Sequence, residues 1–128
     1  MQHAVLIVDD DPQVRTLCRM VLEGPGYIVR EARSGEQALA VIRTTRVDLI
    51  VLDLCMPDTD GFEFQNAIRA GSPTFKIIAT SGFLNATVLS VARMFGATAT
   101  LAKPFSPESL LSIVRKLLAE ERSIWAFD

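Results

Sequence analysis

The acidic residues Asp9, Asp10 and Asp53 have types and positions suited to binding a cation. Asp9 and Asp10 directly follow the apolar run 4–8, and Asp53 closes the apolar run 49–52. If both runs form neighbouring parallel strands, which lie about 4.8 Å apart, three carboxylates meet in one pocket. Their mutual repulsion is costly unless a cation is present or some groups stay protonated. Mg²⁺ prefers carboxylate, water and phosphate oxygens, so the spacing favours a magnesium site.

A simpler interpretation remains open for part of this set. Acidic residues after a strand often cap the next helix, and Asp11, which precedes Pro12, has that pattern. Capping or solvation explains Asp9 and Asp10 about as well as metal binding does. Asp53 favours the metal site, because packing gives a poor explanation of an acid that closes an apolar strand.

Three further polar residues end later apolar runs. Thr80 and Ser81 follow residues 75–79, and Lys103 follows residues 98–102. A hydroxyl can donate a hydrogen bond to a phosphoryl oxygen, and lysine commonly binds phosphate. Taken singly, an ordinary turn or a surface lysine explains each residue better. Their common position at strand ends indicates a shared site for an anion beside the cation.

The elements that position these residues follow from hydrophobic periodicity. Continuous apolar runs are typical of strands buried on both faces, and they alternate here with segments of helical period. The expected strands are 4–8, 27–32, 49–52, 75–79 and 98–102. Helix starts are indicated at Asp11-Pro12, at a Ser34–Gln37 capping box, at Asp60-Gly61 (a short helix) and at Ser106-Pro107.

Five strand-then-helix units predict an α/β fold with a doubly wound, five-stranded parallel sheet of order 2-1-3-4-5, flavodoxin-like (βα)5. Ligands in such sheets bind beyond the carboxyl ends of the strands, where the strand order reverses. The polar residues described above all lie at that edge.

Composition narrows the class of protein. The chain has 128 residues, the size of one domain, with 49% hydrophobic residues and a net charge of −2. The acidic balance argues against nucleic-acid binding, and the apolar run 4–8 is too short for a signal or membrane segment. We therefore expect a cytoplasmic location. Cys18 and Cys55 lack metal-ligand spacing, so two free thiols are expected.

The ordered motifs resemble those of response-regulator receiver domains, including the single-domain chemotaxis type. The resemblance runs from about Val5 to about Leu118. Its motifs are VDDDP at 8–12, DLCMP at 53–57, DG at 60–61, ATSG at 79–82 and KPF at 103–105. It predicts a receiver domain over residues 1–121 and a C-terminal tail or start of a linker over residues 122–128. We expect Trp125 and Phe127 in that tail to pack on the domain; self-association and a linker are the alternatives.

The resemblance implies a signalling switch of a two-component phosphorelay rather than a conventional enzyme. Asp53 would accept a phosphoryl group from a sensor histidine kinase or a histidine phosphotransfer protein. Asp9, Asp10 and Asp53 would bind Mg²⁺ together with the backbone carbonyl of Cys55. The resemblance identifies neither the cognate kinase nor the downstream protein target, and we expect a monomer or weak homodimer without direct nucleic-acid or membrane binding.

The resemblance also assigns a role to two other residues and shows one departure. Ser81 occupies the position of the switch hydroxyl, and Lys103 would pair with the phosphoryl group. Many receivers carry an aromatic residue three positions before that lysine, whereas this chain has Thr100. Threonine cannot reproduce the rotation of an aromatic ring, so phosphorylation is expected but an aromatic switch is not.

Three alternatives compete with this interpretation. A flavin mononucleotide site would need a Ser/Thr/Gly-rich loop after the first strand, but Asp9, Asp10 and Asp11 stand there. A phosphohydrolase of the haloacid dehalogenase kind would carry a second Asp two residues after its nucleophile, where this chain has Cys55. The third is a degenerate receiver used only for protein contacts, and the complete set of site residues argues against it.

Overall fold

The strands and helices alternate along the chain, as expected. The computed structural model describes residues 2–57, 59–71, 75–82, 86–94 and 96–125. The strands are β1 (Ala4–Val8), β2 (Ile28–Ala32), β3 (Leu49–Asp53), β4 (Lys76–Ser81) and β5 (Ala99–Ala102). The helices are α1 (Pro12–Glu23), α2 (Gly35–Thr44), α3 (Gly61–Gly71), α4 (Ala86–Met94) and α5 (Pro107–Trp125).

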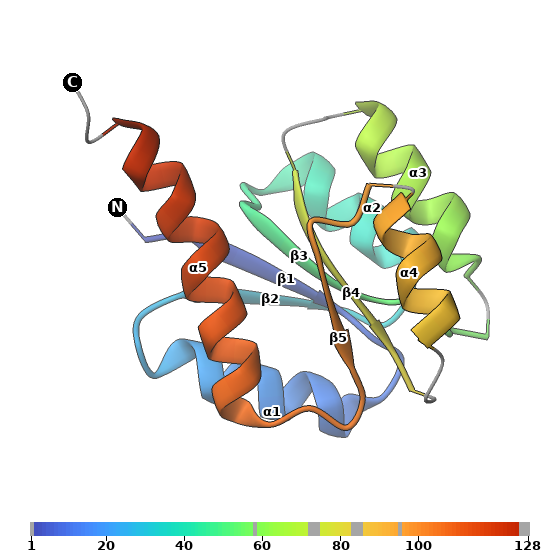
Figure 1. The fold of residues 1–128 in the computed structure, drawn as a ribbon, viewed down its shortest axis with the longest axis horizontal. Helices are drawn as coiled ribbons and strands as arrows, with labels where there is room; N and C mark the ends of the chain where they lie inside the picture. Colours follow the sequence, from blue (N-terminus) through green and yellow to red (C-terminus); the bar gives the residue numbers. More distant parts are fainter. Residues whose placement is uncertain (1, 58, 72–74, 83–85, 95, 126–128) are drawn as a thin grey trace.

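The five strands form one parallel sheet in the order β2-β1-β3-β4-β5, which Figure 1 shows across the centre of the molecule. The predicted doubly wound order is therefore confirmed. The second strand, β2, lies on one side of β1, and the third strand, β3, lies on its other side. The direction in which strands are added to the sheet therefore reverses between β1 and β3. Val8 pairs with Leu52, so these two strands end at the same level.

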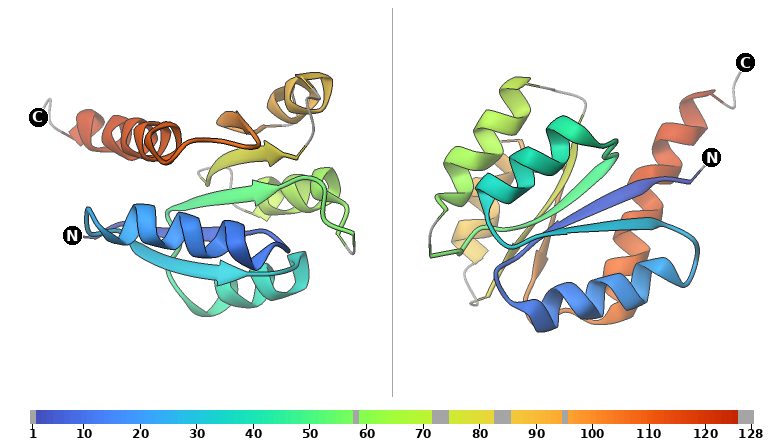
Figure 2. Two further views of the ribbon diagram at one scale, coloured as in Figure 1. Left: turned by 90° about the horizontal axis from the view of Figure 1, so that it is seen from below. Right: turned by 180° about the vertical axis from the view of Figure 1, so that it is seen from behind.

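Helices cover both faces of the sheet, as the two further views show (Figure 2). Val5 and Ile7 of β1 belong to a core cluster with residues of α1 and α5. Leu6 and Val8, which point to the other face, pack in a second cluster with residues of α2, α3 and α4. Burial on both faces explains why β1 is apolar at every position.

Local signals set the starts of α1 and α2. The Asp11 side chain accepts a hydrogen bond from the Gln13 N–H, and Pro12 occupies the first turn. The Ser34 hydroxyl accepts from the Gln37 N–H, as a capping box requires. The return contact differs from the expected motif, because the Gln37 side chain accepts from the N–H of Arg33 and not from that of Ser34.

The helix α3 was expected to be short, but it is 11 residues long. Asp60 caps it by accepting from the N–H groups of Phe62 and Glu63. At Gly61 the helix lies directly against the backbone at the end of β3. A Cβ atom there would lie 2.6 Å from the Leu54 Cα, so only glycine fits this close approach.

Two further expectations concern the cysteines and the end of the chain. Both thiols are free, with Cys18 buried in α1 and Cys55 exposed in the loop after β3, as predicted. In the described part of the chain, none of the helices is long and apolar enough to cross a membrane. The predicted packing of Trp125 and Phe127 lies outside the residues whose side chains are described.

Candidate functional site

The three acidic residues converge at the carboxyl ends of β1 and β3. One carboxylate oxygen from each of Asp9, Asp10 and Asp53 lies within 4.8 Å of the others. Asp9 and Asp53 are buried, with 3% and 4% of their surface exposed, whereas Asp10 is exposed. The predicted meeting of these carboxylates is therefore confirmed. The capping role belongs to Asp11, although one oxygen of Asp9 also accepts from the Asp11 N–H.

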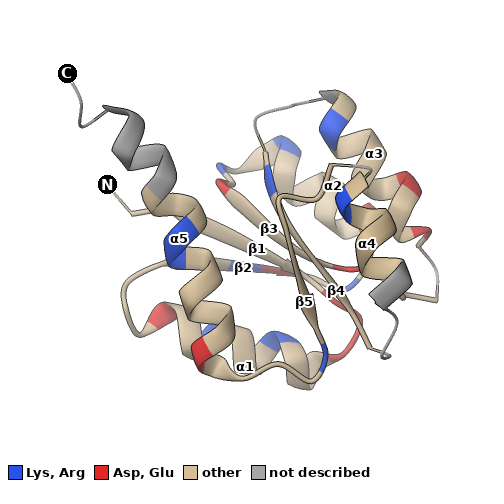
Figure 3. Cartoon of the chain, viewed as in Figure 1, with Lys and Arg blue, Asp and Glu red and all other residues tan. Residues whose placement is uncertain are grey.

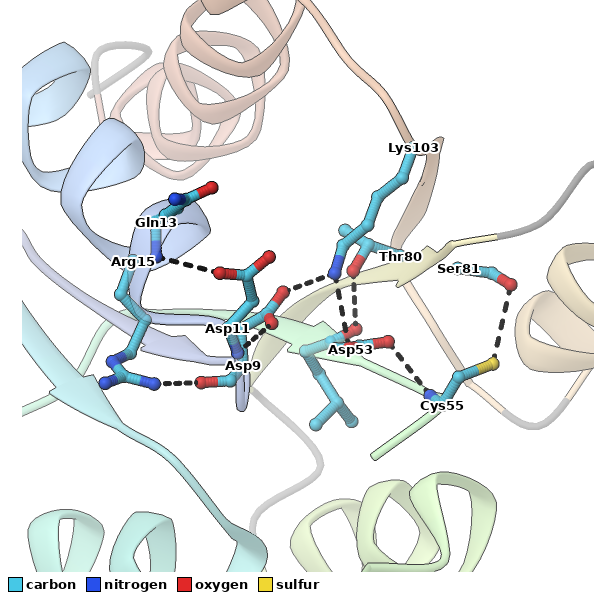
Figure 4. A network of polar contacts seen from close by, with 10 residues as sticks. Asp9, Asp11, Gln13, Arg15, Asp53, Cys55, Thr80, Ser81 and Lys103 are labelled. Carbon is cyan, nitrogen blue, oxygen red and sulfur yellow. Dashed lines mark hydrogen bonds and ion pairs between the residues drawn. The ribbon is translucent and has the colours of Figure 1, made fainter. Parts of the chain in front are cut away.

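The ammonium of Lys103 lies between two of these carboxylates (Figure 4). Its Nζ is 2.5 Å from Oδ2 of Asp9 and 3.2 Å from Oδ2 of Asp53. Lys103 follows β5, whereas Asp9 follows β1 and Asp53 ends β3, so these contacts connect the ends of three strands. The sequence placed Lys103 in the site but did not predict its pairing with Asp9. The Lys103 side chain is half-buried, and pairing with these two carboxylates stabilises its charge where water is partly excluded.

Burial and pairing act in opposite directions on the ionisation of this pair. Burial raises the pKa of the Asp9 carboxyl, although the hydrogen bonds from Lys103 and from the Asp11 N–H oppose that effect. Burial alone would lower the pKa of the Lys103 ammonium. The hydrogen bond and charge of Asp9, followed by the charge of Asp53, outweigh burial and raise that pKa. The site therefore contains a lysine that stays protonated.

The carboxylate of Asp53 is held from two sides. Its Oδ1 accepts a hydrogen bond of 2.9 Å from the Cys55 N–H, and its Oδ2 is the atom near Lys103. Asp53 pairs with Thr80 in the sheet, so it belongs to β3 itself and not to the following loop. The Thr80 hydroxyl donates to the backbone carbonyl of Leu52 at 3.4 Å, while that of Ser81 contacts the Cys55 sulfur at 3.6 Å.

One supporting residue was not predicted from the sequence. The Arg15 guanidinium of α1 donates to the backbone carbonyl of Asp9 at 2.6 Å and forms an ion pair with Glu31 of β2 at 3.1 Å. No sequence motif pointed to an arginine on the first helix, because its contact with β2 depends on how that helix packs against the sheet. The Lys103-Pro104 peptide bond is cis, which was not predicted either.

The donor groups fit a hard divalent cation. Three carboxylates face one ammonium in the cluster, so negative charge is left uncompensated when all are ionised. The available ligand atoms are oxygens, which Mg²⁺ prefers. Figure 3 shows acidic residues at the carboxyl ends of the central strands, whereas charge elsewhere lies mainly on helices, loops, the edge strand β2 and the start of β4.

The chain is similar to known proteins in both sequence and structure. The profile of the response regulator receiver domain family matches residues 5–115. The transcriptional regulatory protein ResD of Bacillus subtilis (strain 168) is 38% identical over 114 residues, which cover 89% of this chain and 47% of ResD. Sporulation initiation phosphotransferase F of the same organism is 30% identical over 118 residues, covering 92% of this chain and 95% of the relative.

Solved structures agree with the family match. A CheY-like response regulator receiver domain protein from Methanospirillum hungatei JF-1 has a TM-score of 0.89 and 28% identity, covering 96% of this chain and 98% of that one. Several curated relatives, ResD among them, are longer, and the chain spans 51% or less of their length. The chain belongs to the response regulator receiver domain family, whose members are phosphoryl-accepting modules of two-component signalling systems and not conventional enzymes.

Proposed function

We propose that the chain is a phosphorelay switch that accepts a phosphoryl group on Asp53 from the phosphohistidine of a sensor histidine kinase or a histidine phosphotransfer protein. The observation that most strongly supports this proposal is the environment of the Asp53 carboxylate. Its carboxylate is buried at the end of β3, held by the Cys55 N–H, and accompanied by the Lys103 ammonium and two further carboxylates. This arrangement orients a nucleophile and supplies opposite charge beside it.

The transfer needs positioning and charge neutralisation more than proton chemistry. An oxygen of Asp53 attacks phosphorus while the bond from phosphorus to the donor imidazole nitrogen breaks, and that nitrogen keeps the electron pair. The product is an acyl phosphate on Asp53. Lys103 can pair with the added phosphoryl oxygens in exchange for its present carboxylate contacts, which lie at 2.5 and 3.2 Å.

The acidic cluster supplies the residues that would hold Mg²⁺. Asp9, Asp10 and Asp53 would contribute carboxylate oxygens, and the backbone carbonyl of Cys55 would add a further ligand. A bound Mg²⁺ would neutralise the charge of the phosphoryl oxygens. The thiol of Cys55 is not needed for this role, and its sulfur contacts Ser81.

Phosphorylation would change the balance between two conformations. The phosphoryl group adds charge and strong acceptors beside Ser81 and Lys103, and drawing these two side chains towards it would bias the surface formed by α4, β5 and α5. Thr100 lies half-buried in β5, opposite Ala79 of β4. Its hydroxyl offers no aromatic rotation, so the signal would depend on Ser81, Lys103 and the loop after β4.

The test is direct phosphorylation by a small donor. The protein is incubated with Mg²⁺ and acetyl phosphate, and intact mass analysis should show one phosphoryl adduct that is absent from Asp53→Asn. Asp60→Asn is the matched control, because asparagine caps α3 as well as aspartate does. An adduct that persists in Asp53→Asn would place the acceptor elsewhere. A wild-type protein without any adduct would favour a receiver used only for protein contacts.

A further inference from the structure

The Ser81 side chain is buried, and one torsion, χ1, sets the position of its hydroxyl oxygen. Only 1% of its surface is exposed. Its backbone is fixed by pairing with Ala102 of β5 and by a hydrogen bond of 2.9 Å from the Lys103 N–H to its carbonyl. The hydroxyl oxygen can therefore move towards another partner only by rotation about χ1, which has three staggered positions.

The Ser81 hydroxyl contacts the sulfur of Cys55. The two atoms are 3.6 Å apart, and Figure 4 shows the Ser81 hydroxyl directed at the sulfur and not at Asp53. Among the described residues, Cys55 is the only hydrogen-bonding partner of this hydroxyl. A buried hydroxyl without a partner is costly, so the sulfur contact selects one rotamer.

Cys55 contacts the site at two separable points. Its backbone N–H donates to Oδ1 of Asp53 at 2.9 Å, while its side chain contacts the hydroxyl of Ser81. Replacing the side chain leaves the backbone N–H in place. The two contributions can therefore be measured independently, which makes the side chain accessible to a clean test.

We propose that Cys55 is a positioning residue whose thiol holds the Ser81 hydroxyl away from Asp53 in the unphosphorylated protein. This inference rests on the proposed function, because it assigns Ser81 to a phosphoryl group on Asp53. That group must displace the sulfur from the hydroxyl. A thiol is a weak hydrogen-bonding group, whereas a bond to a charged oxygen is roughly twice as strong as a neutral one, so the thiol biases the switch without locking it.

The first experiment measures competition for the hydroxyl. Beryllofluoride, an unreactive mimic of a phosphoryl group, is titrated with Mg²⁺ into the wild-type protein, Cys55→Ala and Cys55→Ser, and binding is followed through backbone amide resonances. Cys55→Ala should bind about two- to threefold more tightly, the lower end of the factor expected from removing one hydrogen bond, because the thiol is a weak partner. Cys55→Ser, which keeps a hydrogen-bonding atom, should lie closer to the wild type.

The controls separate positioning from general damage. Cys18→Ala makes the same change at the other cysteine, which is buried on the α1 and α5 side of the sheet, and should leave the affinity unchanged. Equal or weaker binding by Cys55→Ala would overturn the inference while leaving phosphorylation of Asp53 intact.

The second measurement does not depend on phosphorylation. The Hα–Hβ coupling constants of Ser81 report its χ1 rotamer in the protein without Mg²⁺ or mimic. They should indicate one rotamer in the wild type and averaging in Cys55→Ala. Unchanged couplings would overturn the inference. A wild-type protein that binds no mimic would overturn the proposed function, and the couplings would then decide alone whether the thiol holds the hydroxyl.

Discussion

Lys103 and Asp9 form an ion pair between residues 94 positions apart in the chain, with Nζ 2.5 Å from Oδ2. The pair joins the loop after β5 to the end of β1, at the edge where Asp53 also lies. It places a fixed positive charge among three carboxylates. The same carboxylates are the expected ligands of Mg²⁺, so the lysine and the cation compete for them.

Removing the lysine should therefore strengthen Mg²⁺ binding. In Lys103→Met the repulsion between ammonium and cation is lost and two carboxylate oxygens are released, so we expect an affinity at least about fivefold higher. Calorimetric titration measures this change. Lys76→Met is the control, because Lys76 lies at the end of β4 that is away from the site. This variant should bind Mg²⁺ as the wild type does. Unchanged or weaker binding in Lys103→Met would show that the ammonium does not compete.

Removing a ligand should have the opposite effect. Asp10→Asn takes away an exposed carboxylate of the cluster, and we expect Mg²⁺ affinity to fall by about tenfold or more. Asp11→Asn changes the next residue in the same way but keeps the cap of α1, so its affinity should stay near that of the wild type. Equal affinities for the two variants would remove Asp10 from the ligand set.

The close approach of α3 to the end of β3 should make Gly61 intolerant of a side chain. In Gly61→Ala the new Cβ would lie 2.6 Å from the Leu54 Cα, so backbone must move. We expect the free energy of unfolding to fall by about 1–3 kcal/mol, as for overpacking elsewhere. Urea denaturation measures it. At Gly24 a Cβ would meet only ordinary contacts of 3.7 Å or more, so Gly24→Ala should change stability little.

The two thiols should differ sharply in reactivity. Burial, with a smaller contribution from the charge of Asp9, raises the pKa of the Cys18 thiol to about 12. Cys18 should therefore stay unmodified in the folded protein, because the thiolate is the reactive form. Cys55 is exposed. A disulfide reagent at pH 8 should label one thiol per chain without denaturant and two in urea, with Cys55→Ala losing the first. Rapid labelling of Cys18 in folded protein would contradict its burial.

Much of the fold was determined by local sequence. The continuous apolar runs 4–8 and 49–52 indicated strands buried on both faces, and the structure buries every residue of β1 and β3 between helices on the two faces of one parallel sheet. The helix starts at Pro12 and Gly35 followed from the capping residues Asp11 and Ser34. Such signals are readable because hydrophobic periodicity and capping depend on residues a few positions apart.

The meeting of Asp9, Asp10, Asp53 and Lys103 also followed from the sequence, since the carboxyl ends of parallel strands lie at one edge of the sheet. Tertiary structure alone decided which atoms pair there. Lys103 contacts Asp9, the Ser81 hydroxyl turns to the Cys55 sulfur, and Gly61 lies against Leu54. These partners come from different segments, and their choice depends on rotamers and on distances of a few tenths of an ångström. A linear pattern places a residue at an edge, but only the packed chain fixes what its side chain contacts.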